Sequence, residues 1–295
     1  MTFSIIIPAY NAENYVQQSV NSILNQTRGD FEILIADDGS RDNTKKLIDE
    51  MSDTRIKKHH NDKNQGYLKT CNKLMALAKG DFLVFQDSDD LSAPNRLEEQ
   101  YEFIRQNNLD ACGTWVQRID SHGNNTTLEQ LPININEGLA EGKFNFVAGT
   151  FMVHRYLIDS VGLYHSYFDR IGFEDYYWTV LIAFNFRIQN LPLPLYMYRE
   201  NFESVSNNFS TLDKEFSFRS VLYLLNQKLA GLTDYLEENK EKKLKEEVLK
   251  IMLSSRLDNR NSLNKQEVKK LSIDLLKNNP ISLLNWKIAL KQALI

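Results

Sequence analysis

The 295-residue chain is long enough for one large domain or two small ones, and 42% hydrophobic and 25% charged residues are ordinary for a soluble globular protein. A formal net charge of −4 argues against nucleic acid as a partner of the whole molecule. No apolar run approaches the roughly 18 residues that span a bilayer, and no signal peptide is recognisable. Cys71 and Cys112 form no metal-binding pattern. We therefore expect a cytoplasmic protein with reduced, buried thiols, with a single disulfide as the alternative.

Charge is distributed unevenly along the chain. Residues 211–295 contain 16 Lys and Arg against 11 Asp and Glu, whereas the remaining residues contain 19 against 28. An acidic body (19 − 28 = −9) therefore precedes a basic C-terminal region (16 − 11 = +5).

The first 110 residues alternate between short apolar runs and helical periodicities. Strands are predicted at residues 3–8, 31–36, 55–60 and 82–85, and helices at 15–24, 42–51, 65–78 and after Pro94. Alternation of this kind predicts an α/β fold with a parallel, doubly wound sheet flanked by helices.

The pattern loosens after about Ala111. A long loop is predicted for residues 119–145, a helix for 174–186, and an edge strand for 188–198, because Pro192 and Pro194 cannot donate hydrogen bonds in a sheet centre. From Thr211 onward only helices are predicted, at 211–229, 240–256, 265–277 and 281–294. We therefore divide the chain into an α/β domain, residues 1–210 with halves at 1–110 and 111–210, and an all-helical C-terminal extension, residues 211–295.

Three acidic clusters follow apolar segments: Asp37-Asp38, Asp87 to Asp90, and Glu174-Asp175. The first two follow predicted parallel strands, whose carboxyl ends are where open α/β sheets bind ligands. Gathered carboxylates repel one another unless a cation compensates them, which predicts Mg²⁺ or Mn²⁺ held jointly with phosphate groups. The plainer alternatives are a solvated loop at 87–90, an Asp-capped turn at 37–40, and a helix cap at 174–175.

Five motifs stand in order along the chain: Ser4 to Asn11 (SIIIPAYN), Asp37 to Asp42 (DDGSRD), Asn64-Gln65-Gly66, Asp87 to Asp90 (DSDD) and Glu174-Asp175. Together, over roughly residues 1–205, they resemble the motifs of the family 2 glycosyltransferases, which are inverting enzymes of the GT-A fold. The resemblance implies a Rossmann-like α/β fold with a mostly parallel central sheet flanked by helices. The resemblance implies a bacterial surface-polysaccharide enzyme that moves a sugar from a nucleotide-diphosphate donor, most simply a UDP-sugar, to a hydroxyl of a glycan or lipid-linked sugar. Residues 1–110 would bind the nucleotide and residues 111–210 the acceptor.

The resemblance also implies a role for each matched residue. Asp38 would hydrogen-bond the nucleotide base, Asp87 would face the ribose, and Asp89 would ligate Mn²⁺ or Mg²⁺. Asp175 would be the general base that deprotonates the acceptor hydroxyl, and Glu174 would orient the acceptor or the base. Further donor-binding residues are Pro8, Ala9, Tyr10, Asn11, Glu13, Asn64, Gly66, Lys69 and Ser88, and Arg199 is expected to contact the diphosphate.

The chain departs from the family pattern at two places. Relatives commonly carry a basic residue just before an asparagine that follows Asn-x-Gly, but here Cys71 precedes Asn72, which leaves Lys69 as the substitute for phosphate binding. Many relatives also carry a histidine where this chain has Asn201. Metal affinity would then be weaker, or Arg199 would take over phosphate charge.

Other functions fit the sequence less well. A sugar-nucleotide pyrophosphorylase needs a Gly-rich basic loop after its first strand, and a receiver domain needs an acidic pair there, whereas this strand ends in Pro8. A non-catalytic nucleotide-sugar-binding module stays open as an alternative. The mostly apolar segment 281–295, with Trp286 and two lysines, would either lie on the inner face of the cell membrane or pack on protein, including a second copy.

Overall fold

The computed structural model describes residues 2–135, 145–200, 216–221 and 248. The chain forms two compact units, one of Met1–Arg170 and Glu174–Ser204 and the other of Ile171–Phe173 and Val205–Ile295. The described strands all lie in the first unit. The predicted helical extension, 211–295, falls almost entirely outside the described residues, and so does the segment 281–295 with its alternative membrane and protein contacts. Among the helices of the described part, none has the length and apolarity to cross a membrane.

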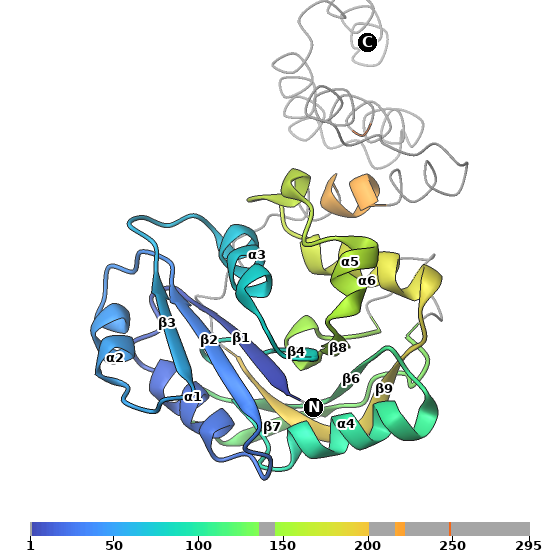
Figure 1. Ribbon diagram of the computed structural model, residues 1–295, viewed down its shortest axis with the longest axis horizontal. Helices are drawn as coiled ribbons and strands as arrows, with labels where there is room; N and C mark the ends of the chain where they lie inside the picture. The colour runs from blue at the N-terminus through green and yellow to red at the C-terminus, as the bar shows by residue number, and fades with distance from the viewer. Residues whose placement is uncertain (1, 136–144, 201–215, 222–247, 249–295) are drawn as a thin grey trace, which may run out of the picture. The chain divides into compact units, whose positions relative to one another are not determined.

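A mixed sheet forms the centre of this unit, with the strand order β3-β2-β1-β4-β8-β6-β9-β5 and with β7 paired to β6 (Figure 1). The strands are β1 (Phe3–Ala9), β2 (Phe31–Asp37), β3 (Ile56–His60), β4 (Phe82–Phe85), β5 (Leu91–Ser92), β6 (Ala111–Ile119), β7 (Asn125–Glu129), β8 (Met152–His154) and β9 (Ile188–Arg199). The first four pair in parallel, as predicted. Antiparallel pairing enters where β8 joins β4 and β6, so the sheet is mixed in its second half.

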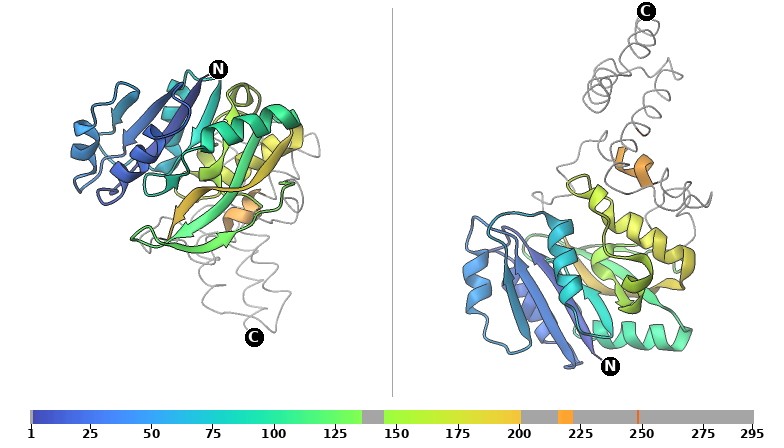
Figure 2. Two further views of the ribbon diagram at one scale, coloured as in Figure 1. Left: turned by 90° about the horizontal axis from the view of Figure 1, so that it is seen from below. Right: turned by 45° about the horizontal axis from the view of Figure 1, so that its top comes forward.

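Helices cover both faces of the sheet. They are α1 (Val16–Leu24), α2 (Thr44–Glu50), α3 (Tyr67–Leu77), α4 (Arg96–Asn107), α5 (Tyr156–Val161) and α6 (Glu174–Asn185), with short 3-10 turns at Ala148–Thr150 and Ser166–Phe168. In Figure 2 the blue α1 and the green α4 lie across the sheet in the left panel, and α3, α5 and α6 lie on its other side in the right panel.

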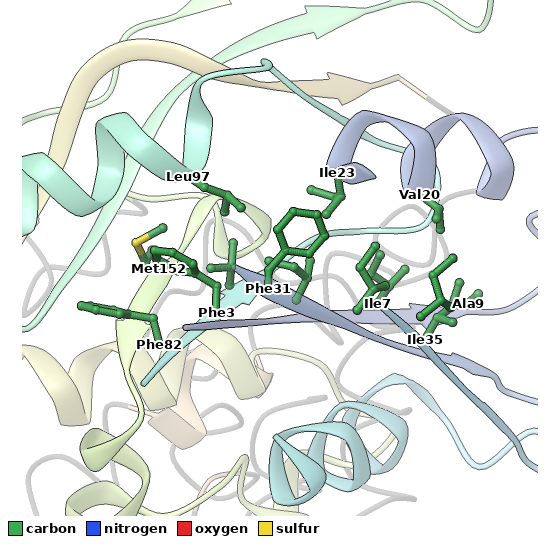
Figure 3. Close-up of a cluster of buried hydrophobic side chains, with 14 of the residues drawn as sticks. Phe3, Ile7, Ala9, Val20, Ile23, Phe31, Ile35, Phe82, Leu97 and Met152 are labelled. Carbon is green, nitrogen blue, oxygen red and sulfur yellow. The ribbon is translucent and has the colours of Figure 1, made fainter. Parts of the chain in front are cut away.

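Alternation along β1 explains why both faces are covered. Phe3, Ile7 and Ala9 point into a core that they share with Val20 and Ile23 of α1 and with residues of α2 and α4 (Figure 3). The strand is buried along its whole length, and α3 packs against β1 and β2. Successive strand residues point to opposite faces, so a continuous apolar run is what a strand covered on both sides requires.

Strand β9 agrees with the predicted edge position of residues 188–198 only in the part that contains the prolines. It lies between β6 and β5, pairing in parallel with β6 and antiparallel with β5. The pairing with β6 shifts register between Thr114 and Trp115, whose partners are Leu191 and Pro194, so Pro192 falls in a bulge. The short β5 pairs only with Tyr196 and Met197, beyond both prolines. Proline is tolerated at this position because the β-ladder is interrupted there, so no ladder hydrogen bond requires the N–H group that proline lacks.

The predicted loop at 119–145 is also partly wrong. β7 runs back along β6 after a turn at residues 120–124, where the Asp120 carboxylate accepts hydrogen bonds from the backbone N–H groups of His122 and Asn124. β7 is exposed along most of its length and its residues are mostly polar. Its sequence therefore lacks the alternation of apolar and polar residues that marks a half-buried strand. Residues 136–144 of the predicted loop lie outside the described residues.

Candidate active site

The carboxyl ends of three parallel strands meet at one edge of the sheet. Ala9 at the end of β1 pairs with Asp37 at the end of β2, and Phe85 at the end of β4 lies beside Ile6. The segments that leave this edge are therefore Tyr10 to Glu13, Asp38 to Ser40 and Gln86 to Asp90. These are the acidic and motif-bearing segments of the sequence, and the topology brings them together as predicted.

Asp38 anchors the loop that contains Asn64 and Gly66. Its buried carboxylate accepts hydrogen bonds from Asn61 Nδ2 (2.8 Å) and from the backbone N–H groups of Gln65 (2.8 Å) and Gly66 (2.9 Å). An ionised carboxylate offers about four acceptor sites, so about one is left for a ligand. Asp38 therefore positions two other predicted donor-binding residues, and its own contact with a nucleotide base stays a prediction.

Pro8 to Glu13 continue from β1 and are tied to the segment after β2. Pro8 and Ala9 are buried, whereas the ring of Tyr10 is 39% exposed. Asn11, at a φ of 49°, accepts from the Arg41 backbone N–H, and Glu13 Oε2 accepts from the backbone N–H and side chain of Asn43. The side chains of Asn11 and Glu13 thus hold this loop, and Tyr10 is its exposed aromatic surface.

The acidic turn after β4 is built around the buried amide of Gln86. Its Nε2 donates to the backbone carbonyls of Asp87 and Asp90, and its Oε1 accepts from Ser92 Oγ and from Arg96 Nη1. The guanidinium of Arg96 is fully buried and also donates to the carbonyls of Phe85 and Gly149. A charged group is thereby fixed behind the turn, and burial lowers the pKa of Arg96 to about 10.

Arg199 lies behind the acidic turn. Its guanidinium is buried, donates to the backbone carbonyls of Asp89 (2.8 Å), Asp120 (3.1 Å) and Ser121 (3.1 Å), and lies over the ring of Tyr15. These hydrogen bonds fix the backbone of the acidic turn, and contact between Arg199 and a diphosphate stays a prediction.

Burial and mutual repulsion disfavour the ionised form of the carboxyl groups in this turn. Burial, followed by repulsion from Asp89, raises the pKa of Asp87 to about 7. Burial raises the pKa of Asp90 well above its usual range, with repulsion from Asp87 and Asp89 adding to the effect. Asp90 Oδ1 accepts from the Arg199 backbone N–H, whereas Asp90 Oδ2 is buried without a hydrogen-bond partner within the described residues. This excess of negative charge favours a bound cation.

Glu174 and Asp175 begin α6, which aromatic packing fixes beside the turn. Trp178, one helical turn after Asp175, is buried and packs edge-on against Phe85, the last residue of β4, with ring centroids 5.8 Å apart. Burial raises the pKa of Glu174 to about 8, and repulsion from Asp175 is the next cause. Burial also raises the pKa of Asp175, and Asp175 in turn contributes to the raised pKa of Asp87. The third acidic cluster therefore lies near the second.

The remaining predicted residues lie around this group. Lys69 of α3 is half-exposed, with its Nζ 2.6 Å from Asp169 Oδ2. Ser88 and Asp89 are half-buried within the acidic turn. Tyr67, at the start of α3, donates from its hydroxyl to Asp87 Oδ1 (3.4 Å). Cys71 and Cys112 are both buried free thiols, as expected.

A divalent cation fits these residues only in part. Within the described chain, no group of three or more His, Cys, Asp or Glu side chains is arranged to hold a metal. Asp87, whose pKa burial raises to about 7, and Asp90 Oδ2, which has no hydrogen-bond partner within the described residues, nevertheless supply carboxyl oxygens in this turn. Mg²⁺ commonly takes one or two carboxylates and completes its coordination with substrate phosphates. The donor set therefore fits an ion that is held jointly with a diphosphate.

Sequence reasoning missed the buried supports of the site. Gln86, Arg96 and Tyr67 contact the acidic turn but stand outside the recognised motifs. The available signal was a polar residue directly after the buried strand β4 and an arginine in the first turn of the following helix. Neither signal indicates that its side chain turns inward.

Comparison with known proteins agrees with this geometry. The model of the family described as glycosyl transferase family 2 matches residues 4–166, more than half of the chain. The chain belongs to glycosyltransferase family 2.

Two known bacterial glycosyltransferases are similar to this chain over part of their length. WfgD of Escherichia coli, a UDP-Glc:α-D-GlcNAc-diphosphoundecaprenol β-1,3-glucosyltransferase, is 42% identical over 106 residues, which cover 36% of this chain and 42% of WfgD. The glycosyltransferase GlyG of Streptococcus pneumoniae is 30% identical over 164 residues, which cover 50% of this chain and 54% of GlyG. The chain thus spans about half or less of the length of these relatives.

A solved structure shows the same fold. S. aureus TarS 1-349 in complex with UDP-GlcNAc superposes with a TM-score of 0.65 at 19% identity, covering 94% of this chain and 81% of the TarS chain. This likeness confirms the α/β architecture predicted from the motifs.

Proposed function

We propose that this family 2 member is an inverting glycosyltransferase that moves a sugar from a UDP-sugar to a hydroxyl of a sugar acceptor. The observation that carries the proposal is the meeting of Asp38, the turn Asp87 to Asp90 and the pair Glu174-Asp175 at one edge of the sheet. Membership of the family and the UDP-Glc in the name of WfgD support a UDP-sugar as donor.

The donor would lie along the sheet edge. The exposed ring of Tyr10 offers a stacking surface for the base, and the acceptor site left on Asp38 would receive a hydrogen bond from it. Lys69, which is half-exposed, would supply positive charge to the phosphates. Asp87 would face the ribose, and Asp89 with its neighbours would hold Mn²⁺ or Mg²⁺. The ion, when bound, neutralises charge that develops on the departing diphosphate.

Asp175 would act as the general base. A sugar hydroxyl is a weak nucleophile, and a carboxylate that removes its proton on the side opposite the leaving group gives one displacement with inversion. Burial raises the pKa of Asp175, which makes its carboxylate a better proton acceptor once ionised. Glu174, with a pKa of about 8, would stay protonated at pH 7 and donate a hydrogen bond that orients the acceptor.

The acceptor is proposed from the relatives. The name of WfgD specifies a GlcNAc-diphosphoundecaprenol acceptor, so we propose a lipid-linked sugar and a role in cell-surface polysaccharide synthesis at the inner face of the membrane.

Thermal melting with nucleotides tests the donor site. UDP at 100 times its Kd should stabilise the protein by about 2.7 kcal/mol, which corresponds to about 5–10 °C for a unit of this size. We expect this shift with UDP and Mn²⁺, and smaller shifts with GDP, dTDP or UDP in EDTA. Asp89→Asn should remove the dependence on Mn²⁺, whereas Asp159→Asn, an exposed aspartate of α5, should melt like the wild type in all conditions. Absence of a shift with every nucleotide would contradict the proposal.

A further inference from the structure

Arg170 reaches from the segment before Glu174 to the loop that Asp38 anchors. Its Nη2 donates to the backbone carbonyl of Asn64 (3.1 Å) and to Asn64 Oδ1 (2.8 Å). One nitrogen of a rigid guanidinium therefore holds both the backbone and the side chain of a single residue. Arg170 does so from a φ of 63°, a conformation that costs a non-glycine residue free energy and is kept only where surrounding contacts impose it.

Gly66 permits this close approach. A Cβ placed on Gly66 would lie 3.0 Å from Arg170 Nε and 3.2 Å from Arg170 Cζ, so the guanidinium lies directly against this glycine. The backbone N–H of Gly66 also donates a hydrogen bond to Asp38 Oδ2 at 2.9 Å. Asp38 and Arg170 thus grip the same short loop, one through its N–H groups and the other through Asn64.

Asp169 adds a second link to the same region. Its Oδ2 lies 2.6 Å from Lys69 Nζ, and its Oδ1 lies 3.9 Å from Arg170 Nε. Asp169 and Arg170 therefore contact the two ends of the stretch that runs from Asn64 to Lys69. Asp169 also contributes, after burial and Asp175, to the raised pKa of Glu174, which places its charge near the carboxylate pair.

We propose that Arg170 is a positioning residue that clasps the donor loop, Asn64 to Gly66, to the segment leading into Glu174 and Asp175. The clasp would hold the nucleotide-binding loop and the base in one geometry, so that loosening either side weakens donor binding. An exposed ion pair alone contributes little, and Arg170 is 59% exposed. The two hydrogen bonds to Asn64 are what fix the loop. This inference rests on the proposed function for its ligand, which is UDP.

Calorimetric titration with UDP and Mn²⁺ tests the clasp. Arg170→Ala should weaken UDP binding about tenfold, the usual loss for hydrogen bonds to a charged group, while its melting temperature without ligand stays close to that of the wild type. Arg105→Ala is the matched control, because Arg105 is 60% exposed and pairs with Glu102 at 2.7 Å on α4. That variant should bind UDP like the wild type.

A double-mutant cycle with Asn64→Ala separates the clasp from an independent effect. If Arg170 acts through the loop, the two substitutions lose less together than the sum of their separate losses. Additive losses, or unchanged UDP affinity in Arg170→Ala, would overturn the inference. A wild-type protein that binds no UDP would instead contradict the proposed function, so the two failures are distinguishable.

Discussion

At Glu174, the burial on which the proposed chemistry depends also lowers the stability of the folded protein. Its pKa is raised from 4.5 to about 8, chiefly by burial and then by repulsion from Asp175. Below pH 4.5 both the folded and the unfolded chain carry the proton, so the shift has no effect. Between pH 4.5 and about 8 the unfolded chain ionises first, and stability falls as the pH rises.

Glu174→Gln should therefore stabilise the protein in a pH-dependent manner. In EDTA we expect a gain in the free energy of unfolding of about 2 kcal/mol or more at pH 9 and almost none at pH 4, since each unit of pKa shift corresponds to about 1.4 kcal/mol. Denaturant unfolding at both pH values measures the gain. The exposed Glu50 of α2 offers the control Glu50→Gln. Equal gains at the two pH values would show that Glu174 does not titrate in this way.

Among single residues, the acidic groups of the site are easier to predict from the sequence than the buried arginines beside them. The carboxylates stand in short motifs at strand ends, where topology fixes their position. The opposing cations Arg96 and Arg199 are placed by tertiary contacts, Arg96 with the carbonyls of Phe85 and Gly149, and Arg199 with that of Asp120. Nothing in the local sequence distinguishes such an arginine from one on the surface, so the sequence could not predict that Arg96 and Arg199 are buried.

Among the elements, the turn Asp37 to Ser40 depends most on its glycine. Gly39 has a φ of 68°, and a Cβ there would lie 2.6 Å from the carbonyl carbon of Lys63 and 2.7 Å from the nitrogen of Asn64. A side chain at this position would push the donor loop away from Asp38. The turn and the loop therefore have to be considered as one structure.

Substitution of three glycines by alanine separates backbone strain from this collision. Gly39→Ala should lose about 2 kcal/mol or more of unfolding free energy. Gly123→Ala should lose about 1 kcal/mol, because Gly123 has a φ of 88° but no atom within 4 Å of its would-be Cβ. Gly29→Ala, with neither feature, should change little. Comparable losses at Gly39 and Gly123 would mean that the close approach of residues 63 and 64 is not maintained in solution.

Elements with a clear period were predictable and the others were not. β1, β2, β4 and the helices between them were expected from apolar runs and helical spacing, and they occur within a few residues of the expected bounds. β7 is exposed, so its sequence lacks the signals of a strand, whereas β9 was predicted as a strand but its sequence does not show its pairing with both β6 and β5. Non-local pairing of this kind cannot be deduced from a single segment.

At the largest scale, both halves of the first unit contribute residues to the candidate site. The parallel strands β1, β2 and β4 provide the edge that carries Asp38 and the acidic turn. The later elements provide α6, which Trp178 holds against the end of β4. In the proposed function, Asp175 of the second half performs the proton transfer.

The role of Asp175 is tested by measuring the release of UDP from UDP-Glc and UDP-GlcNAc by the wild type and by Asp175→Asn, in the presence of Mn²⁺ and a lipid-linked GlcNAc acceptor. We predict that Asp175→Asn lowers turnover by about 10²–10⁴-fold, the usual contribution of a general base, while UDP affinity stays within about twofold of the wild type. Asp159→Asn should turn over like the wild type. Equal turnover by Asp175→Asn and the wild type would contradict the claim and leave the chain as a nucleotide-sugar-binding protein whose Asp175 does no chemistry.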